Sequence, residues 1–295
     1  MRAGESLTYI NGRGEQVVLA ARNKPAYWLS SAEGIDGLES EMFSARGAGQ
    51  DGETLSGTAL QARVITVEGR VMPKKGAYLG RRELLRVVNP KLEGRLVYRD
   101  EDRGVTRYIA CRVQQAPIFS ESDRFPVFQF ELFCPYPYWR DGDGTTRRVM
   151  DIALWVPNFS FDLEIPEEGI ELEYRAPSLI VNVPNLGDAP TGMVIEFRAL
   201  GSLTAPSLVN VRTQQSLCLT TGMVAGDVLR VATGYGEKTA VLTRAGEQIN
   251  VFSDVTVDSD WLQLEVGDNL LRYNAGDGLD NLECTISYAY NYLGV

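Results

Sequence analysis

Apolar and polar residues alternate with a period of two along nearly the whole chain, and this pattern limits the fold more than any other feature of the sequence. Successive side chains of a strand point to opposite faces of a sheet, so such alternation predicts strands with one buried face. The clearest runs are Ser6–Ile10, Arg63–Met72, Leu96–Arg99, Arg107–Val113 and Val127–Cys134. The sequence therefore predicts a mainly β protein.

One segment departs from the alternation and predicts a single main helix. Over Tyr78–Val88, Leu84, Leu85 and Val88 recur at helical spacing among charged residues, and the pattern stops before Pro90. The residue before a proline is pushed away from helical backbone angles, so the helix is expected to end there. The fold class is thus β with one short helix.

The chain divides near residue 140, where strand alternation gives way to prolines and then to Asp141-Gly142-Asp143-Gly144. We expect one domain over residues 1–140 and another over 141–295. The second reads as short strands separated by turns, a spacing typical of an antiparallel sandwich. Its expected turns are Gly187-Asp188, Gly226-Asp227, Gly246-Glu247 and Gly267-Asp268-Asn269.

Charge separates the two halves as well. Residues 1–140 carry 20 Lys and Arg against 17 Asp and Glu, whereas residues 141–295 carry 9 against 22. An acidic half repels nucleic-acid phosphates, and the first half mixes both signs, so no specific nucleic-acid binding is expected. No apolar run approaches the roughly 20 residues that span a bilayer, and no secretory signal is visible near Met1, so neither a membrane span nor export by a signal peptide is expected.

Catalytic and cofactor chemistry receives little support. The chain has no histidine, which removes the usual general base and the commonest transition-metal ligand. Its four cysteines have no C-x-x-C spacing and are expected to be buried thiols. We therefore expect neither an enzyme nor a bound cofactor or metal, although paired carboxylates in a cleft are a three-dimensional property that a chain with 39 acids leaves open.

Four local motifs resemble ligand sites but have a simpler interpretation. Residues 47–52 match G-x-G-x-x-G without a preceding strand or following helix, and residues 234–239 lack the glycine that precedes lysine in a phosphate loop, so a loop and a hairpin are expected. Asp141 and Asp143 could open a calcium loop, but its later ligand positions are wrong, which favours an acidic linker. Trp261 with Asp258 and Asp260 could hold sugar, or could form a solvated loop with the indole over the core.

The order of several distinctive segments resembles the distal tail protein family of long-tailed bacteriophages. In the first half the most distinctive is Phe130 to Trp139, FELFCPYPYW. The others are residues 7–15, 27–29, 33–37, 49–53, 63–69, 81–90 and 94–98 in the first half, and 183–191, 226–229, 261–269 and 290–295 in the second. In the second half, Val266 stands where the family often has proline.

This resemblance implies a structural protein of the virion tail tip, assembled in the host cytoplasm. It implies an N-terminal split-barrel-like domain that forms a homo-hexameric ring, and a galectin-like β-sandwich. Its implied partners are the tail tube protein, the tail-tip protein and receptor-binding proteins docked on the ring. The particle could be a long flexible tail, a contractile tail or a phage-derived bacteriocin.

A ring protein needs a sheet edge or an arm offered to its neighbour. The glycine-rich connection from Glu33 to Gly57 is the expected arm, and the alternative for it is a mobile surface loop. Its candidate contact residues are Gly34, Asp36, Gly37, Gly49, Gln50, Asp51 and Gly52. A carbohydrate-binding host-recognition module, using Trp261, Asp258 and Asp260, is the alternative function.

Overall fold

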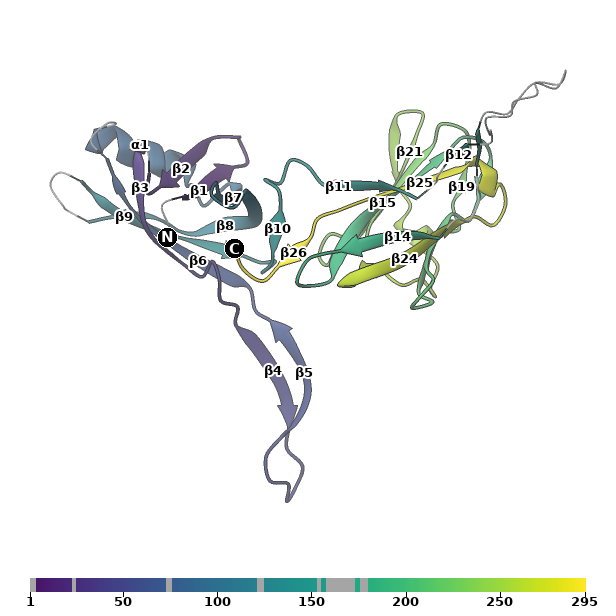
Figure 1. Cartoon of the computed structure of the whole chain (residues 1–295), viewed down its shortest axis with the longest axis horizontal. Coiled ribbons are helices and arrows are strands. Elements are labelled where there is room, and N and C mark those ends of the chain that lie inside the picture. Colours follow the sequence, from purple (N-terminus) through teal and green to yellow (C-terminus); the bar gives the residue numbers. More distant parts are fainter. Residues whose placement is uncertain are drawn as a thin grey trace. The chain divides into compact units, whose positions relative to one another are not determined.

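The computed structural model describes residues 4–22, 25–72, 76–120, 125–152, 155–157, 173–175 and 180–295, in two compact units (Figure 1). The first unit comprises Met1–Thr146 together with Asn291–Val295, and the second comprises Arg147–Tyr290. The chain is mainly β with one α-helix among the described residues, as the alternation and its single interruption predict.

The first unit is built around a closed seven-stranded barrel. Its strands follow the order β8-β7-β1-β2-β3-β6-β9, and β9 pairs back onto β8. All of these pairings are antiparallel except β2 with β3. The strands are β1 Glu5–Asn11, β2 Gln16–Ala20, β3 Tyr27–Glu33, β6 Arg63–Val71, β7 Glu93–Asp100, β8 Val105–Phe119 and β9 Val127–Cys134.

Alternate residues of these strands form the core, because inward-facing side chains recur at every second position. Leu7, Ile65, Phe128 and Phe130 are fully buried there. Burial of each such side chain stabilises the fold by about 1.5–3 kcal/mol. The alternation visible in the sequence is therefore the barrel's inside-outside pattern.

The helix α1, Ala77–Val87, packs against β2, β6 and β8. It buries Leu84, Val87 and the following Val88, and Tyr27 Oη lies 3.1 Å from the carbonyl oxygen of Gly80. Pro90 lies just beyond its end, where a helix could not continue. The sequence-based expectation of a helix over Tyr78–Val88 is confirmed.

The chain's end is part of the first unit. β10, Trp139–Asp141, pairs with β8, and β26, Asn291–Tyr292, pairs with β10. Two further strands, β4 Ser40–Ala45 and β5 Thr54–Leu60, form a hairpin that extends from the barrel (Figure 1). The segment expected as a glycine-rich connection is thus a hairpin with regular strands.

The second unit contains two larger antiparallel sheets. The seven-stranded sheet has the order β11-β25-β15-β20-β21-β22, with β23 paired to β15, and the four-stranded sheet has the order β14-β24-β17-β18. Two-stranded pairs join β16 to β19 and β12 to β13. Buried residues from both larger sheets, among them Phe197, Ile286, Leu208 and Tyr273, form its interior.

The strands of the seven-stranded sheet are β11 Arg148–Asp151, β15 Thr191–Ala199, β20 Val228–Ala232, β21 Thr239–Arg244, β22 Glu247–Asn250, β23 Gln263–Leu264 and β25 Leu282–Tyr288. The others are β12 Trp155–Pro157, β13 Glu173–Arg175, β14 Val181–Asn185, β16 Leu203–Thr204, β17 Ser207–Asn210, β18 Ser216–Cys218, β19 Gly222–Met223 and β24 Gly267–Asn274. Short 3-10 helices span Phe252–Asp254 and Leu279–Asn281.

Two expectations for loops in the second unit have opposite outcomes. The hairpin expected over residues 234–239 is confirmed, because β20 and β21 pair across it. The turn expected at residues 267–269 is wrong, because these residues begin β24. The turn lies just before them: Asn269 Oδ1 accepts a hydrogen bond from the Glu265 amide (2.9 Å), and Asn269 Nδ2 donates to the Glu265 carbonyl (2.8 Å). Asparagine here holds a turn from within the adjoining strand.

Candidate assembly surface

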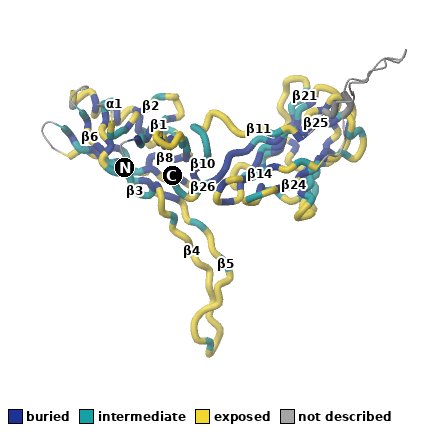
Figure 2. Tube along the Cα trace, viewed as in Figure 1, coloured by how far each residue is buried: buried dark blue, intermediate teal, exposed yellow. Residues whose placement is uncertain are grey.

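The hairpin of β4 and β5, which we call the arm, is the most exposed regular element of the first unit (Figure 2). Every residue of β4 is exposed, and among the described strands β4 pairs only with β5. Met42, Leu55 and Phe43 expose 67%, 57% and 48% of their surfaces. Isolated two-stranded hairpins are marginally stable in water, so an arm with uncovered apolar side chains has the properties of an interface element.

The register of the arm assigns its side chains to two faces. Phe43 pairs with Gly57 and Glu41 with Ala59, so Glu41 and Phe43 share one face. Met42 lies on the opposite face, because neighbouring residues of a strand point in opposite directions. Both faces of the arm therefore present apolar surface to solvent.

The tip of the arm is held by its own polar groups. Gln50 accepts a hydrogen bond from the Gly47 amide (3.0 Å) and donates to Thr54 Oγ1 (3.0 Å), while Arg46 Nε donates to the Gln50 carbonyl oxygen (2.9 Å). Gly49 and Gly52 have φ angles of 77° and 80°, which glycine adopts without strain. Gly49, Gln50, Asp51 and Gly52, which the sequence offers as candidate contact residues, thus form one compact turn, and the G-x-G-x-x-G match is the tip of the hairpin.

The base of the arm is fixed by Arg63, which sequence reasoning did not single out. Its buried guanidinium donates to the carbonyl oxygens of Gly34 (2.6 Å), Gly37 (3.3 Å), Pro137 (2.9 Å) and Leu293 (2.6 Å). Burial lowers the pKa of Arg63. The predicted residues Gly34 and Gly37 therefore accept hydrogen bonds from Arg63 through their carbonyl groups. They lie at the root of the arm, at the opposite end from its tip.

Aromatic and C-terminal groups complete this root. The Trp139 indole N–H donates to the carbonyl oxygen of Ile35 (3.0 Å), and the guanidinium of Arg107 lies 3.7 Å from the Tyr292 ring centre. Arg107 also donates to the carbonyl oxygen of Gly294, which packs beside Asp36. The arm thus starts from a platform held by hydrogen bonds and by the contact of Arg107 with the Tyr292 ring.

The residues of the carbohydrate alternative are arranged differently from an open sugar platform. Phe252 stacks on the Trp261 indole, with ring centres 5.3 Å apart and planes inclined by 21°. Lys238 Nζ lies 5.1 Å from the centre of the same indole. Asp258 and Asp260 are exposed. The indole therefore already has an aromatic and a cationic neighbour.

Within the described parts of the chain, no group of three or more His, Cys, Asp or Glu side chains is arranged to hold a metal ion. Cys111, Cys134 and Cys284 are buried free thiols and Cys218 is half-buried. Asp143, from the candidate calcium loop, accepts hydrogen bonds from the amide (2.9 Å) and hydroxyl of Thr145, which lower its pKa. No described helix is both long and apolar enough for a membrane crossing.

Two family descriptions match separate parts of the sequence. The family described as phage tail protein RIFT-related domain matches residues 34–134, which include the whole arm and Arg63. The family described as siphovirus-type tail component, C-terminal domain, matches residues 186–292. Together they span more than two thirds of the chain.

The chain belongs to the siphovirus-type distal tail protein family. It is accordingly a structural component of the distal end of a phage tail and not an enzyme. The family resemblance read from the sequence is confirmed. No curated protein sequence matches the chain.

Solved structures share the fold of this distal tail protein. A crystal structure of the SPP1 Dit protein, described as a paradigm of the hub adsorption apparatus in phages that infect Gram-positive bacteria, matches with a TM-score of 0.67 and 15% identity over 97% of this chain and 98% of that one. Two structures of the phage p2 baseplate in its activated conformation, with Ca and with Sr, each match with a TM-score of 0.53 and 10% identity over 99% of both chains.

Proposed function

We propose that six copies of this chain form a ring through their first units, and that the ring is the hub joining the tail tube to the tail-tip protein. The observation that carries this proposal is the arm, a preorganised hairpin whose apolar side chains are uncovered in one copy. Receptor-binding proteins would dock on the assembled hub. Assembly takes place in the host cytoplasm, before the virion is released.

The physical argument is that the arm requires a partner of matching shape. Covering the side chains of Met42, Phe43 and Leu55 would stabilise the contact by about 25 cal/mol for each Å² of apolar surface removed from water. Each copy offers one arm and receives one, which makes the contact heterologous, and heterologous contacts close into rings when the rotation permits. The fold shared with the SPP1 hub protein supports the same reading.

A carbohydrate-binding module is the alternative, and the second unit favours it less. A sugar stacking on Trp261 would compete with the existing contacts of Phe252 and Lys238. The arm would have no role in such a module. We therefore assign host binding to proteins docked on the hub.

The proposal is tested by shortening the arm. The Gln61 amide donates to the Glu39 carbonyl oxygen (3.0 Å) at the root of the arm. If only two residues joined Glu39 to Gln61, the same hydrogen bond would close a two-residue hairpin turn. Replacing residues 40–60 with Asn-Gly should therefore leave the barrel intact. Negative-stain electron microscopy of the purified full-length chain should show six-fold rings, and the shortened chain should show single particles. Rings of equal abundance in both samples would refute a role for the arm.

A further inference from the structure

We propose that the arm of one copy docks on the exposed face of α1 of the next copy, with Glu41 against Arg82 and Phe43 against Leu79. This inference rests on the proposed ring and names the surface that receives the arm. It is carried by a second feature of the molecule, independent of the arm itself: a helix that presents arginines and uncovered apolar side chains to solvent.

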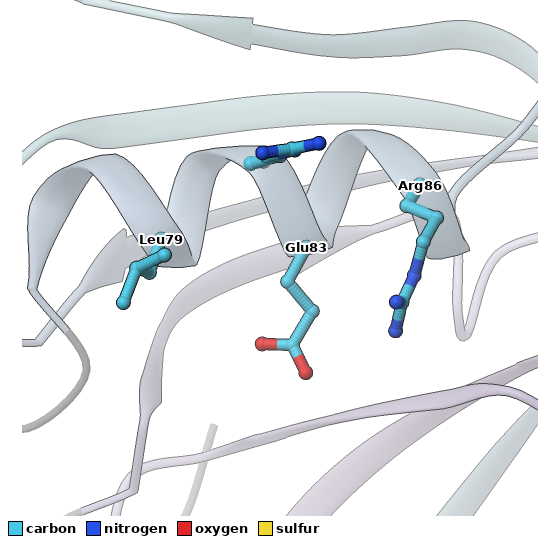
Figure 3. A pocket seen from close by; sticks show the side chains of 4 residues that line it. Leu79, Glu83 and Arg86 are labelled. Carbon is cyan, nitrogen blue, oxygen red and sulfur yellow. The ribbon is translucent and has the colours of Figure 1, made fainter.

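The exposed face of α1 carries apolar side chains among its charged ones. Tyr78, Leu79 and Leu85 expose 74%, 63% and 47% of their surfaces. Leu79, Glu83 and Arg86 extend from the same side of the helix, one turn apart (Figure 3). Together with Arg82 they line an open hollow of about 590 Å³. A hollow running along a helix suits an extended strand.

The charged groups of this face are only partly engaged within the described residues of one copy. Arg86 lies 3.3 Å from Glu15, and Glu83 Oε2 lies 2.5 Å from Tyr27 Oη. The guanidinium of Arg81 lies over the ring of Phe119. Arg82 has no ion pair with any residue that the structure describes, and its side chain is exposed. It is the cation available to an incoming carboxylate.

The arm is complementary to this face in charge and in apolar content. Residues 38–60 contain four acids and one arginine, whereas α1 contains three arginines and one glutamate. On the arm, the acidic side chain of Glu41 lies beside the apolar side chain of Phe43 on one face. On the helix, the basic side chain of Arg82 and the apolar side chain of Leu79 line the same hollow. Opposite charges facing each other fix the register of a contact and exclude wrong ones.

Two sets of full-length variants test this docking. In the first, Glu41→Arg and Arg82→Glu are made singly and together. Each single reversal places like charges opposite each other and should weaken assembly about tenfold or more, and the double variant should restore much of it. The readout is the concentration at which half of the chains are assembled, measured by light scattering.

In the second set, chains carrying Phe43→Cys are mixed with chains carrying Leu79→Cys and oxidised mildly with copper phenanthroline. A cross-linked dimer should form in this mixture. Met42→Cys is the matched control, because Met42 neighbours Phe43 in sequence but lies on the opposite face of the arm. Each variant oxidised alone gives the background from the natural cysteines.

The outcomes separate this inference from the proposed function. Rings that form normally without a cross-link above the Met42→Cys control, or without rescue in the double reversal, overturn the docking and leave the ring standing. If the full-length chain without substitutions remains monomeric at every concentration, the proposed ring is overturned, and the docking with it. A cross-link specific to Phe43 and Leu79, with rescue by the double reversal, is the expected result.

Discussion

Arg63→Met should destabilise the first unit strongly, because the buried guanidinium of Arg63 donates hydrogen bonds to the carbonyl groups of four residues. Three of these hydrogen bonds are 2.9 Å or shorter, to Gly34, Pro137 and Leu293. A buried acceptor left without its donor costs about 1–3 kcal/mol. Removing the buried charge returns part of that cost. We expect a net loss of about 3 kcal/mol.

The effect is measured by urea unfolding of the full-length chain at one fixed concentration, followed by pulsed hydrogen exchange and mass spectrometry. This reads peptides of the first unit separately from those of the second. Arg70→Met is the matched control, since Arg70 lies on the same strand with its side chain exposed, and it should change stability by less than about 0.5 kcal/mol. The exchange of residues 34–37 and 291–295 should rise together in Arg63→Met. Equal stabilities for the two variants would refute the reasoning.

Three further predictions, tested with four substitutions, concern other parts of the molecule. Gly34→Ala should lower the free energy of unfolding of the first unit by about 2–3 kcal/mol in urea, because its φ is 78° and a Cβ would overlap a carbonyl oxygen of β6. Gly49→Ala, at a φ of 77° with open space around it, should lower it by about 1 kcal/mol. Equal losses in the two variants would contradict this reasoning. The hydrogen bond from Arg244 lowers the pKa of Asp227, so this carboxylate stabilises the second unit above about pH 4, and the stabilisation is lost as pH falls through the lower pKa of the folded state. In Asp227→Asn the melting temperature of the second unit should therefore fall less steeply on the acid side. An unchanged acid dependence would exclude Asp227 as a source of acid sensitivity. Trp261→Ala should leave the ring mass unchanged while lowering the stability of the second unit by about 1–2 kcal/mol, and abolished binding to host cell-wall polysaccharide would instead favour the carbohydrate alternative.

Local sequence patterns predicted most of the barrel because its strands obey a local rule. In Ser6–Ile10 and Val127–Cys134 the apolar residues at every second position are buried, namely Leu7, Tyr9, Phe128, Phe130, Leu132 and Cys134, whereas Ile10 and Val127 are half-buried and Phe133 is exposed. The pairing that closes the barrel, β8 with β9, is a matter of partner choice between alternating segments, which periodicity does not encode. The helix was predictable because its two signals, apolar residues spaced three or four apart and the proline at position 90 beyond its end, both lie within one short stretch of sequence.

The arm was recognised as a segment but not as a hairpin, because its glycines dominated the interpretation. The signal that could have revealed it is the Asp51-Gly52 pair between two short segments of alternating residues. Arg63 carried a subtler signal, since it occupies the same strand parity as Ile65 and Val67 and must therefore point inward. Its partners could not be predicted, because Gly34, Pro137 and Leu293 come from three distant parts of the chain. The return of residues 291–295 to the first unit has no local sequence signal either.

The most direct test of the central claim is the mass in solution of the full-length chain beside the arm-shortened chain, by light scattering at near-physiological salt. The account predicts a full-length particle of about six times the 32.6 kDa chain mass and a shortened chain that stays monomeric with an intact barrel. A full-length chain that stays monomeric at the highest soluble concentration, or a shortened chain that assembles equally well, would contradict it.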